Sequence, residues 1–219
     1  MLIHSFMLAK RLVKMNEHVG GARMLIRVAQ NISQFPQNMV NILTSCVAEC
    51  TKGNLKQAAF TWSCVLVRPE YRNQVPPNFQ KKIESIARRP VKEEDEPEPV
   101  SPCPFCKFEI PETLLDCPSC KNFIPFCIAS GKHMILPEWS CCPSCKMPAI
   151  YTDFKKLLEN DPTCPMCEQS ISPVSLQLSS EPEKEFKELA GLMKESGPDD
   201  DKDQNGEEEG DEEDDDDNM

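Results

Sequence analysis

Four Cys-x-x-Cys pairs lie within 65 residues of this chain, and they constrain its fold more than any other feature of the sequence. Structural zinc takes four thiolate or imidazole ligands in a tetrahedron. A two-residue gap lets one tight turn bring both sulfurs to one metal, so two such turns complete the shell. The candidate metal ligands are Cys103, Cys106, Cys117, Cys120, Cys142, Cys145, Cys164 and Cys167.

The spacing between these pairs predicts two structural Zn²⁺ ions, each bound by consecutive pairs. Ten residues separate the first two pairs, which is typical of a zinc ribbon with short hairpins. Eighteen residues separate the last two pairs, and this insert is expected to form a short helix. Four thiolates leave no open position for a water molecule, so we expect no catalytic residue and no enzymatic activity.

Cys141 adjoins Cys142, and only one of these two neighbours fits the two-residue turn that ends at Cys145. We assign Cys142 as the ligand and Cys141 as a spectator. A thioredoxin-like redox pair would be single and would follow a strand, which four tandem pairs do not resemble. Iron–sulfur ligation is the other alternative, but four thiolates at ribbon spacing favour zinc.

Cys127 and His133 exceed what two zinc ions require. They could join one metal in a cross-braced arrangement and displace another pair. Alternatively, Cys127 is a buried thiol and His133 fixes the turn at Ser130-Gly131. We favour these structural roles because each zinc takes four ligands.

Residues 1–89 are predicted to form helices, because apolar residues recur there at spacings of three and four. One helix ends near Gly53, Asn54 is expected to cap the next (residues 55–67), and Pro76-Pro77 opens another. Residues 53–60 resemble the turn and second helix of a tetratricopeptide repeat, whose period is about 34 residues. The fold class is therefore mainly α with tetratricopeptide-like repeats, and an irregular helical bundle is the alternative.

The N-terminal helix carries an apolar stripe that we expect to be uncovered, because about two repeats cannot bury a continuous core. This stripe comprises Leu2, Ile3, Phe6 and Leu8. It predicts either that the chain is the C-terminal piece of a longer solenoid or that a partner docks there.

Charge and composition divide the rest of the chain. Residues 1–89 contain 13 Lys/Arg and 4 Asp/Glu, whereas residues 181–219 contain 4 and 19. We expect an acidic, proline-rich linker at 90–101, the zinc-binding module at 102–175, and a short helix with a disordered acidic tail at 176–219. The start is not a signal peptide and no apolar run predicts a membrane span, so the expected location is the cytosol.

Several segments of the cysteine-rich half are similar to the C-terminal end of an intraflagellar transport complex A subunit. They are residues 102–108, 117–122, 124–134, 148–151 and 163–167. The resemblance implies a tetratricopeptide-like solenoid that ends in a zinc module and acts as a non-enzymatic scaffold. It further implies roles in retrograde ciliary transport, cilium assembly and cargo trafficking. The implied partners are the other complex A subunits, and the implied locations are the cytoplasm and the cilium, at its basal body and axoneme.

Two other functions compete with this one. A RING-like ubiquitin ligase would need central ligands spaced as Cys-x-His-x2-Cys, and this spacing is absent from the sequence. Zinc ribbons can also bind nucleic acid, but residues 103–167 contain 6 Lys, no Arg and 7 acidic residues. Because phosphate binding requires a basic surface, we expect no nucleic-acid partner.

Overall fold

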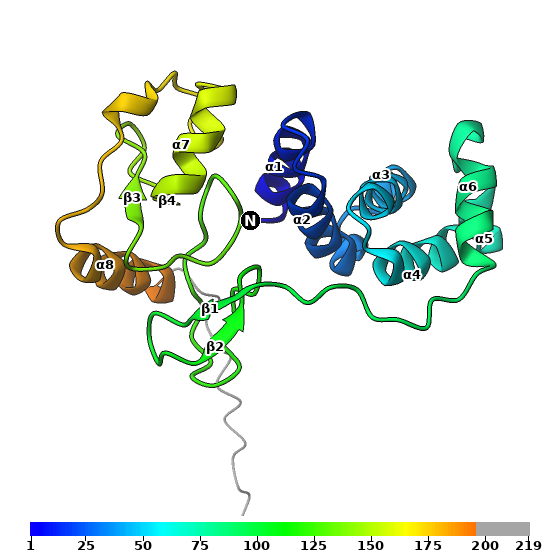
Figure 1. Ribbon diagram of the computed structural model, residues 1–219, viewed down its shortest axis with the longest axis horizontal. Helices are drawn as coiled ribbons and strands as arrows, with labels where there is room; N and C mark the ends of the chain where they lie inside the picture. Colours follow the sequence, from blue (N-terminus) through cyan, green and yellow to red (C-terminus); the bar gives the residue numbers. More distant parts are fainter. Residues whose placement is uncertain (196–219) are drawn as a thin grey trace, which may run out of the picture.

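The computed structural model describes residues 1–195, so most of the predicted acidic tail lies outside the described residues. Helices fill the N-terminal half, and each main helix packs on the next one along the chain (Figure 1). This order gives a stack of helices, as tetratricopeptide-like repeats would. The α-helices are α1 (Leu2–Lys14), α2 (His18–Gln30), α3 (Met39–Lys52), α4 (Lys56–Leu66), α5 (Pro69–Arg72) and α6 (Pro77–Ala87). Two short 3₁₀ turns, η1 (Ile32–Gln34) and η2 (Pro36–Asn38), join α2 to α3.

Proline positions explain where the later helices begin. Pro69 and Pro77 each occupy the first turn of a helix, where the missing N–H costs nothing. The expected cap of α4 is wrong, however. Asn54 adopts a left-handed backbone conformation with φ 59°, and the α4 N-terminus carries no cap from its own flank. The carboxylate of Asp95 caps α4 instead, by accepting the backbone N–H groups of Gln57 (2.7 Å) and Ala58 (2.9 Å).

The cysteine-rich half consists of short hairpins and two helices. Strand β1 (Val100–Pro102) pairs with β2 (Glu109–Pro111), and β3 (Trp139–Cys141) pairs with β4 (Pro148–Ile150), both antiparallel. Helix α7 (Tyr151–Asn160) fills the predicted helical insert, and a 3₁₀ turn, η3 (Pro173–Ser175), follows it. Helix α8 (Pro182–Glu195) then returns across the hairpins.

The two halves share one hydrophobic core, so the N-terminal stripe is not uncovered as the sequence predicted. Leu8 is fully buried, and Leu2 and Phe6 are half-buried. Only Ile3 of the four stays exposed, at 70%. The cysteine-rich half packs against this helix, and the His4 ring lies 5.2 Å from that of Phe126.

The linker contacts the helical half. It runs back from α6 along the helices to β1 (Figure 1). Asp95 fastens its middle to α4, and the Glu98 carboxylate lies 3.6 Å from the Arg23 guanidinium and accepts the hydroxyl of Thr113 at 2.5 Å. The acidic residues that identify the linker in the sequence therefore also bind it to the basic helices.

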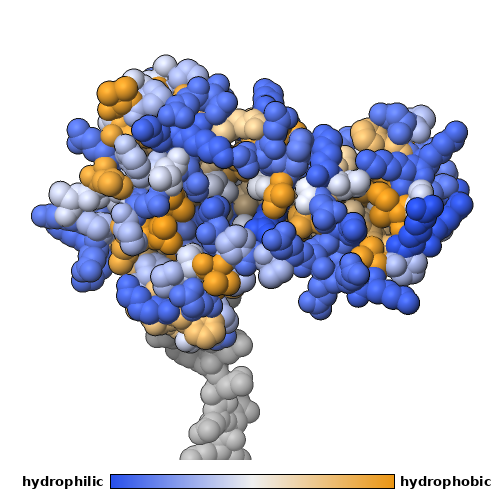
Figure 2. All heavy atoms as spheres, in the orientation of Figure 1, coloured by the Kyte–Doolittle hydropathy of each residue, from blue (hydrophilic) through white to orange (hydrophobic). Residues whose placement is uncertain are grey.

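The surface seen in Figure 2 is mostly hydrophilic, with scattered apolar residues. Among the described residues, no helix combines the length and the apolar character needed to cross a bilayer.

Candidate metal centres

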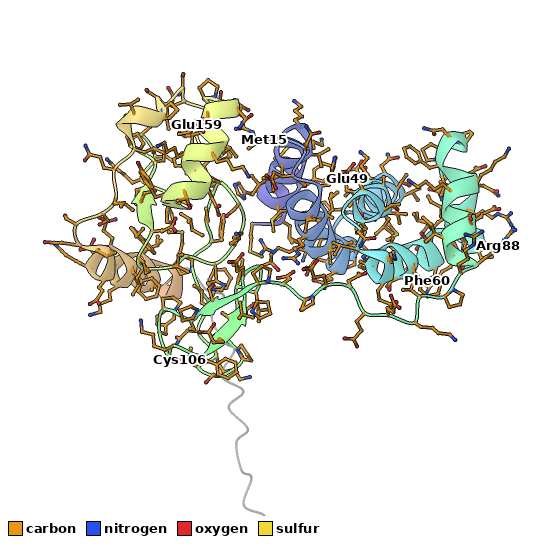
Figure 3. The ribbon with its side chains drawn as sticks, in the orientation of Figure 1. Met15, Glu49, Phe60, Arg88, Cys106 and Glu159 are labelled. Atoms are coloured by element: carbon orange, nitrogen blue, oxygen red, sulfur yellow. The ribbon has the colours of Figure 1, made fainter. Side chains whose placement is uncertain are left out.

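The eight predicted ligands gather in two clusters of four. Cys103, Cys106, Cys117 and Cys120 form the first cluster, and Cys142, Cys145, Cys164 and Cys167 form the second. Within each cluster all four Sγ atoms lie within 4.8 Å of one another. The clusters contain consecutive pairs, and the cross-braced alternative would have needed alternating ones. Figure 3 labels Cys106 in the hairpin region of the first cluster.

The sulfur separations match the edges of a zinc tetrahedron. A Zn–S bond of about 2.3 Å requires tetrahedral sulfurs to lie about 3.8 Å apart. In the first cluster Cys103 and Cys120 are separated by 3.9 Å, and Cys106 and Cys117 by 3.6 Å. In the second, both contacts between the two turns are 3.9 Å. A disulfide requires about 2.05 Å, so these thiols are placed for shared metal coordination.

Each Cys-x-x-Cys pair sits in a turn with one repeated backbone pattern, which we call a knuckle. If the first cysteine is position i, its N–H donates to the carbonyl of i+5 and its carbonyl accepts the N–H of i+4. Residue i+4 has a positive φ of 57° to 64°. These i+4 residues are Lys107, Lys121, Lys146 and Glu168. The bonds hold the sulfurs on one side of the turn and offset the cost of a left-handed non-glycine residue.

Backbone donors make one thiol in each cluster acidic. The N–H of Asn122 lowers the pKa of Cys120 to about 6, and the N–H of Gln169 lowers that of Cys167 to about 7. Burial has the opposite effect on Cys103 and Cys164, whose pKa values it raises to about 12. Each cluster thus contains one acidic thiol, and a zinc ion held by the four cysteines would favour the thiolate form of the buried ones as well.

The comparisons with known proteins point to the same region. Residues 97–121 match the model of the IFT144 first zinc finger domain, and residues 125–172 match that of the IFT121 second zinc finger domain. The chain is 51% identical to mouse WD repeat-containing protein 19 over 177 residues, which are 81% of the chain. The chain is a homologue of WD repeat-containing protein 19.

Two further relatives extend this result. The human WD repeat-containing protein 19 is 49% identical over 83% of the chain, and the Caenorhabditis elegans WD repeat-containing protein dyf-2 is 40% identical over 76%. The matched regions span only 12–13% of the lengths of these relatives. The homology therefore covers the helices and zinc fingers of this chain and a small part of each WD-repeat protein.

A fifth knuckle, which the sequence argument missed, lies within the second zinc-finger match. It starts at Cys127, whose N–H donates to the carbonyl of Lys132 and whose carbonyl accepts the N–H of Gly131. Gly131 occupies position i+4 with φ 71°, and Ser130 takes the place of the second cysteine. The flanking residues pair as in the other four knuckles. The signal was available in the sequence, because Cys-x-x-Ser-Gly-Lys differs from a ligand turn mainly by serine for cysteine.

This fifth knuckle satisfies its sulfur without joining either cluster. Cys127 is fully buried, and its Sγ accepts the backbone N–H groups of Ala129 (3.4 Å) and Ile150 (3.2 Å). Burial raises the pKa of the Cys127 thiol. His133 also lies outside both clusters, and it does not fix the Ser130-Gly131 turn as predicted. The Nε2 atom of His133 lies 2.7 Å from Ser101 Oγ. Its backbone N–H donates to the Glu112 carbonyl, so His133 joins the knuckle to the first hairpin.

Helix α8 covers the other spectator, Cys141. The carboxylate of Glu185 accepts the Cys141 thiol at 3.4 Å and the Trp139 indole N–H at 2.8 Å. The ring of the neighbouring residue, Phe186, lies 4.7 Å from that of Phe105, which is in the first knuckle of the first cluster. It also lies 6.0 Å from the ring of Trp139, which is on β3 beside the second cluster. One helix thereby contacts both zinc fingers.

Arg27 of α2, a second residue that the sequence argument missed, joins the helices to the fingers. Its buried guanidinium donates to the carbonyls of Thr113 and Gly131 (the latter at 2.7 Å). Close packing at Gly131 explains the glycine there, since a Cβ atom would lie 2.2 Å from Met24 Sδ. Burial lowers the pKa of Arg27 to about 10, so it stays charged at neutral pH. Helix α2 therefore packs against the fifth knuckle.

Proposed function

We propose that this chain is a non-enzymatic assembly subunit of intraflagellar transport complex A. In this proposal it binds other complex A subunits, acts in retrograde ciliary transport, cilium assembly and cargo trafficking, and resides in the cytoplasm and the cilium. The homology to WD repeat-containing protein 19 across both helices and zinc fingers carries the proposal.

The metal chemistry supports a structural role. We assign the eight clustered cysteines as the ligands of two Zn²⁺ ions, in the order in which they occur in the chain. Four thiolates complete each shell and give each site a formal charge of −2, which is unfavourable for activating water. Structural zinc of this kind contributes folding free energy directly, so its loss is expected to unfold the finger that holds it.

The two alternative functions have less support. A RING-like ligase uses cross-braced pairs, whereas each cluster here is built from consecutive ones. For a nucleic-acid-binding ribbon, the balance of 6 Lys against 7 acidic residues between Cys103 and Cys167 supplies no basic surface.

Metal content is tested by native mass spectrometry of the full chain, where we expect a mass increment of two zinc ions. Cys145→Ser should remove one zinc and loosen the second finger. Cys141→Ser is the matched control, since Cys141 directly precedes the same knuckle but lies outside the cluster, and it should retain both zinc ions. A chain with one or three zinc ions, or a zinc lost from Cys141→Ser alone, would contradict the ligand assignment.

The assembly role is tested by purifying the tagged full chain from ciliated cells and quantifying the proteins that accompany it. Complex A subunits should be enriched with the wild type and with Cys141→Ser, and depleted with Cys145→Ser. If no complex A subunit is enriched, the assembly role is wrong. Ubiquitin chains formed by the purified protein in a ligase assay would instead move it into the ligase class.

A further inference from the structure

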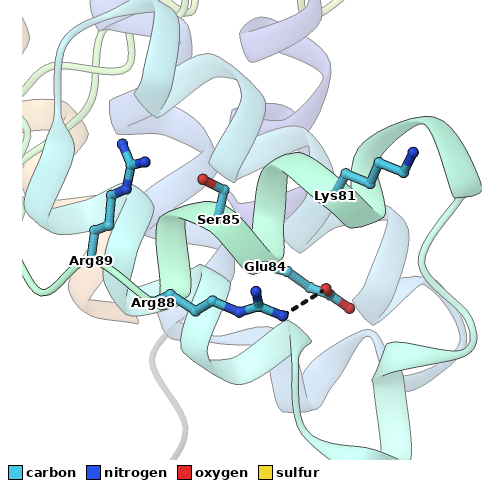
Figure 4. A pocket seen from close by; sticks show the side chains of 5 residues that line it. All are labelled: Lys81, Glu84, Ser85, Arg88 and Arg89. Carbon is cyan, nitrogen blue, oxygen red and sulfur yellow. Dashed lines mark hydrogen bonds and ion pairs between the residues drawn. The ribbon is translucent and has the colours of Figure 1, made fainter.

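The outer end of the helical stack carries a cluster of cations on α5, on α6 and directly after α6. It lies at the opposite end of the molecule from α8 (Figure 1). Figure 4 shows a shallow pocket there, lined by Lys81, Glu84, Ser85, Arg88 and Arg89. Figure 3 labels Arg88 at this end, where Figure 2 shows hydrophilic residues. We call this surface the α6 basic face and define it by Arg72, Lys81, Arg88 and Arg89.

The α6 basic face has more cations than its own carboxylate can neutralise. Glu84 accepts Arg72 at 2.7 Å on one oxygen and lies 3.4 Å from Arg88 on the other. In the part of the chain that the structure describes, Lys81 and Arg89 have no carboxylate within ion-pair distance. The side chains of Arg72 and Arg88 are 59% and 77% exposed, so they can turn toward an incoming anion. The face therefore offers four cations for one anion.

The complementary charge lies in the same polypeptide. Residues 196–219 contain 14 Asp/Glu and a single Lys, and the acidic residues are densest from 207 to 217. No other stretch of the chain has this charge density. A run of like charges in a terminal segment is typical of a sequence that binds an oppositely charged surface.

We propose that the acidic segment 207–217 binds the α6 basic face of its own molecule. Residues 207–217 lie 12 to 22 residues beyond Glu195, so an extended chain carries them on the order of 40 to 75 Å from it. This reach equals or exceeds the width of roughly 40 Å that a compact 195-residue domain has. Tethering raises the local concentration of the segment to about the millimolar range, so individually weak ion pairs suffice.

A zero-length carbodiimide cross-link tests this in the intact chain, because it joins a lysine amine to a carboxylate only when the two are in contact. Cleavage after Lys202 releases the peptide 203–219, and mass spectrometry identifies the lysine attached to it. At low salt Lys81 should be attached to this peptide at least tenfold more often than the exposed lysines Lys14 and Lys155. Because the contact is ionic, about 0.5 M salt should abolish this preference.

Charge reversal supplies the matched control. Arg88→Glu with Arg89→Glu should lower the Lys81 cross-link about tenfold or more, whereas Lys14→Glu with Lys155→Glu changes the net charge equally and should leave it intact. Circular dichroism checks that both variants fold. Equal labelling of all exposed lysines overturns the proposal. So does a Lys81 cross-link that forms only between two chains and disappears on hundredfold dilution, because the segment would then bind a second copy.

Discussion

Replacing Arg27 with methionine should uncouple the helices from the zinc fingers. The guanidinium donates to two backbone carbonyls, the partly buried one of Thr113 and the buried one of Gly131. These contacts join residues that lie 86 and 104 positions apart in the sequence. Leaving each carbonyl without a donor costs about 1–3 kcal/mol. The methionine keeps the apolar stem and removes the cost of burying a charge, which is evident in the lowered pKa of Arg27. We therefore expect a net destabilisation of about 3 kcal/mol.

The two tryptophans report on the two halves separately, because Trp62 lies on α4 and Trp139 on β3. Fluorine NMR of a fluorotryptophan-labelled chain should show both native signals lost together during urea unfolding of the wild type. In Arg27→Met they should be lost at different urea concentrations. Arg72→Met, which breaks an exposed ion pair, is the control and should cost less than about 1 kcal/mol. The reasoning is refuted if Arg27→Met matches this control or if both signals still vanish together at the wild-type midpoint.

Three other changes probe separate contacts. Asp95→Ala removes the α4 cap and should lower the free energy of unfolding, measured in urea, by about 1 kcal/mol. Asp95→Asn keeps one acceptor and should lower it by less; equal losses would argue against capping. Burial lowers the pKa of His4 to about 4, so the folded state binds fewer protons than the unfolded state, and stability should fall as pH drops from 6.5 toward 4. His4→Gln should show a shallower loss between pH 7 and 5, and identical slopes would exclude His4. Phe186→Ala should lower the free energy of unfolding by about 3 kcal/mol and should expose Trp139. Exposure would shift the Trp139 fluorescence to the red, and an unshifted spectrum would mean that α8 does not cover Trp139.

Local chemistry accounts for what the sequence could predict. The grouping of thiols follows from a two-residue gap, and the starts of α5 and α6 follow from proline, because each depends only on neighbouring residues. The sequence predicts an uncovered N-terminal stripe because nothing in its periodicity indicates that the cysteine-rich half folds back on it. Arg27 and Asp95 were missed for the same reason, since an arginine in an amphipathic helix and an aspartate in an acidic linker both look like ordinary surface residues. The fifth knuckle does not stand out as a ligand turn because Ser130 replaces its second cysteine.

The docking of α1 on the distant zinc fingers affects the order of events during synthesis. The guanidinium of Arg11 donates to the carbonyl of Thr163 at 2.7 Å, across 152 residues. At a translation rate of about 5–20 residues per second, the ribosome takes roughly 8–30 s to make this stretch. The apolar surface around α1 therefore waits in the nascent chain for a partner that has not yet been translated. Slow elongation or scarce zinc would therefore prolong the exposure of α1.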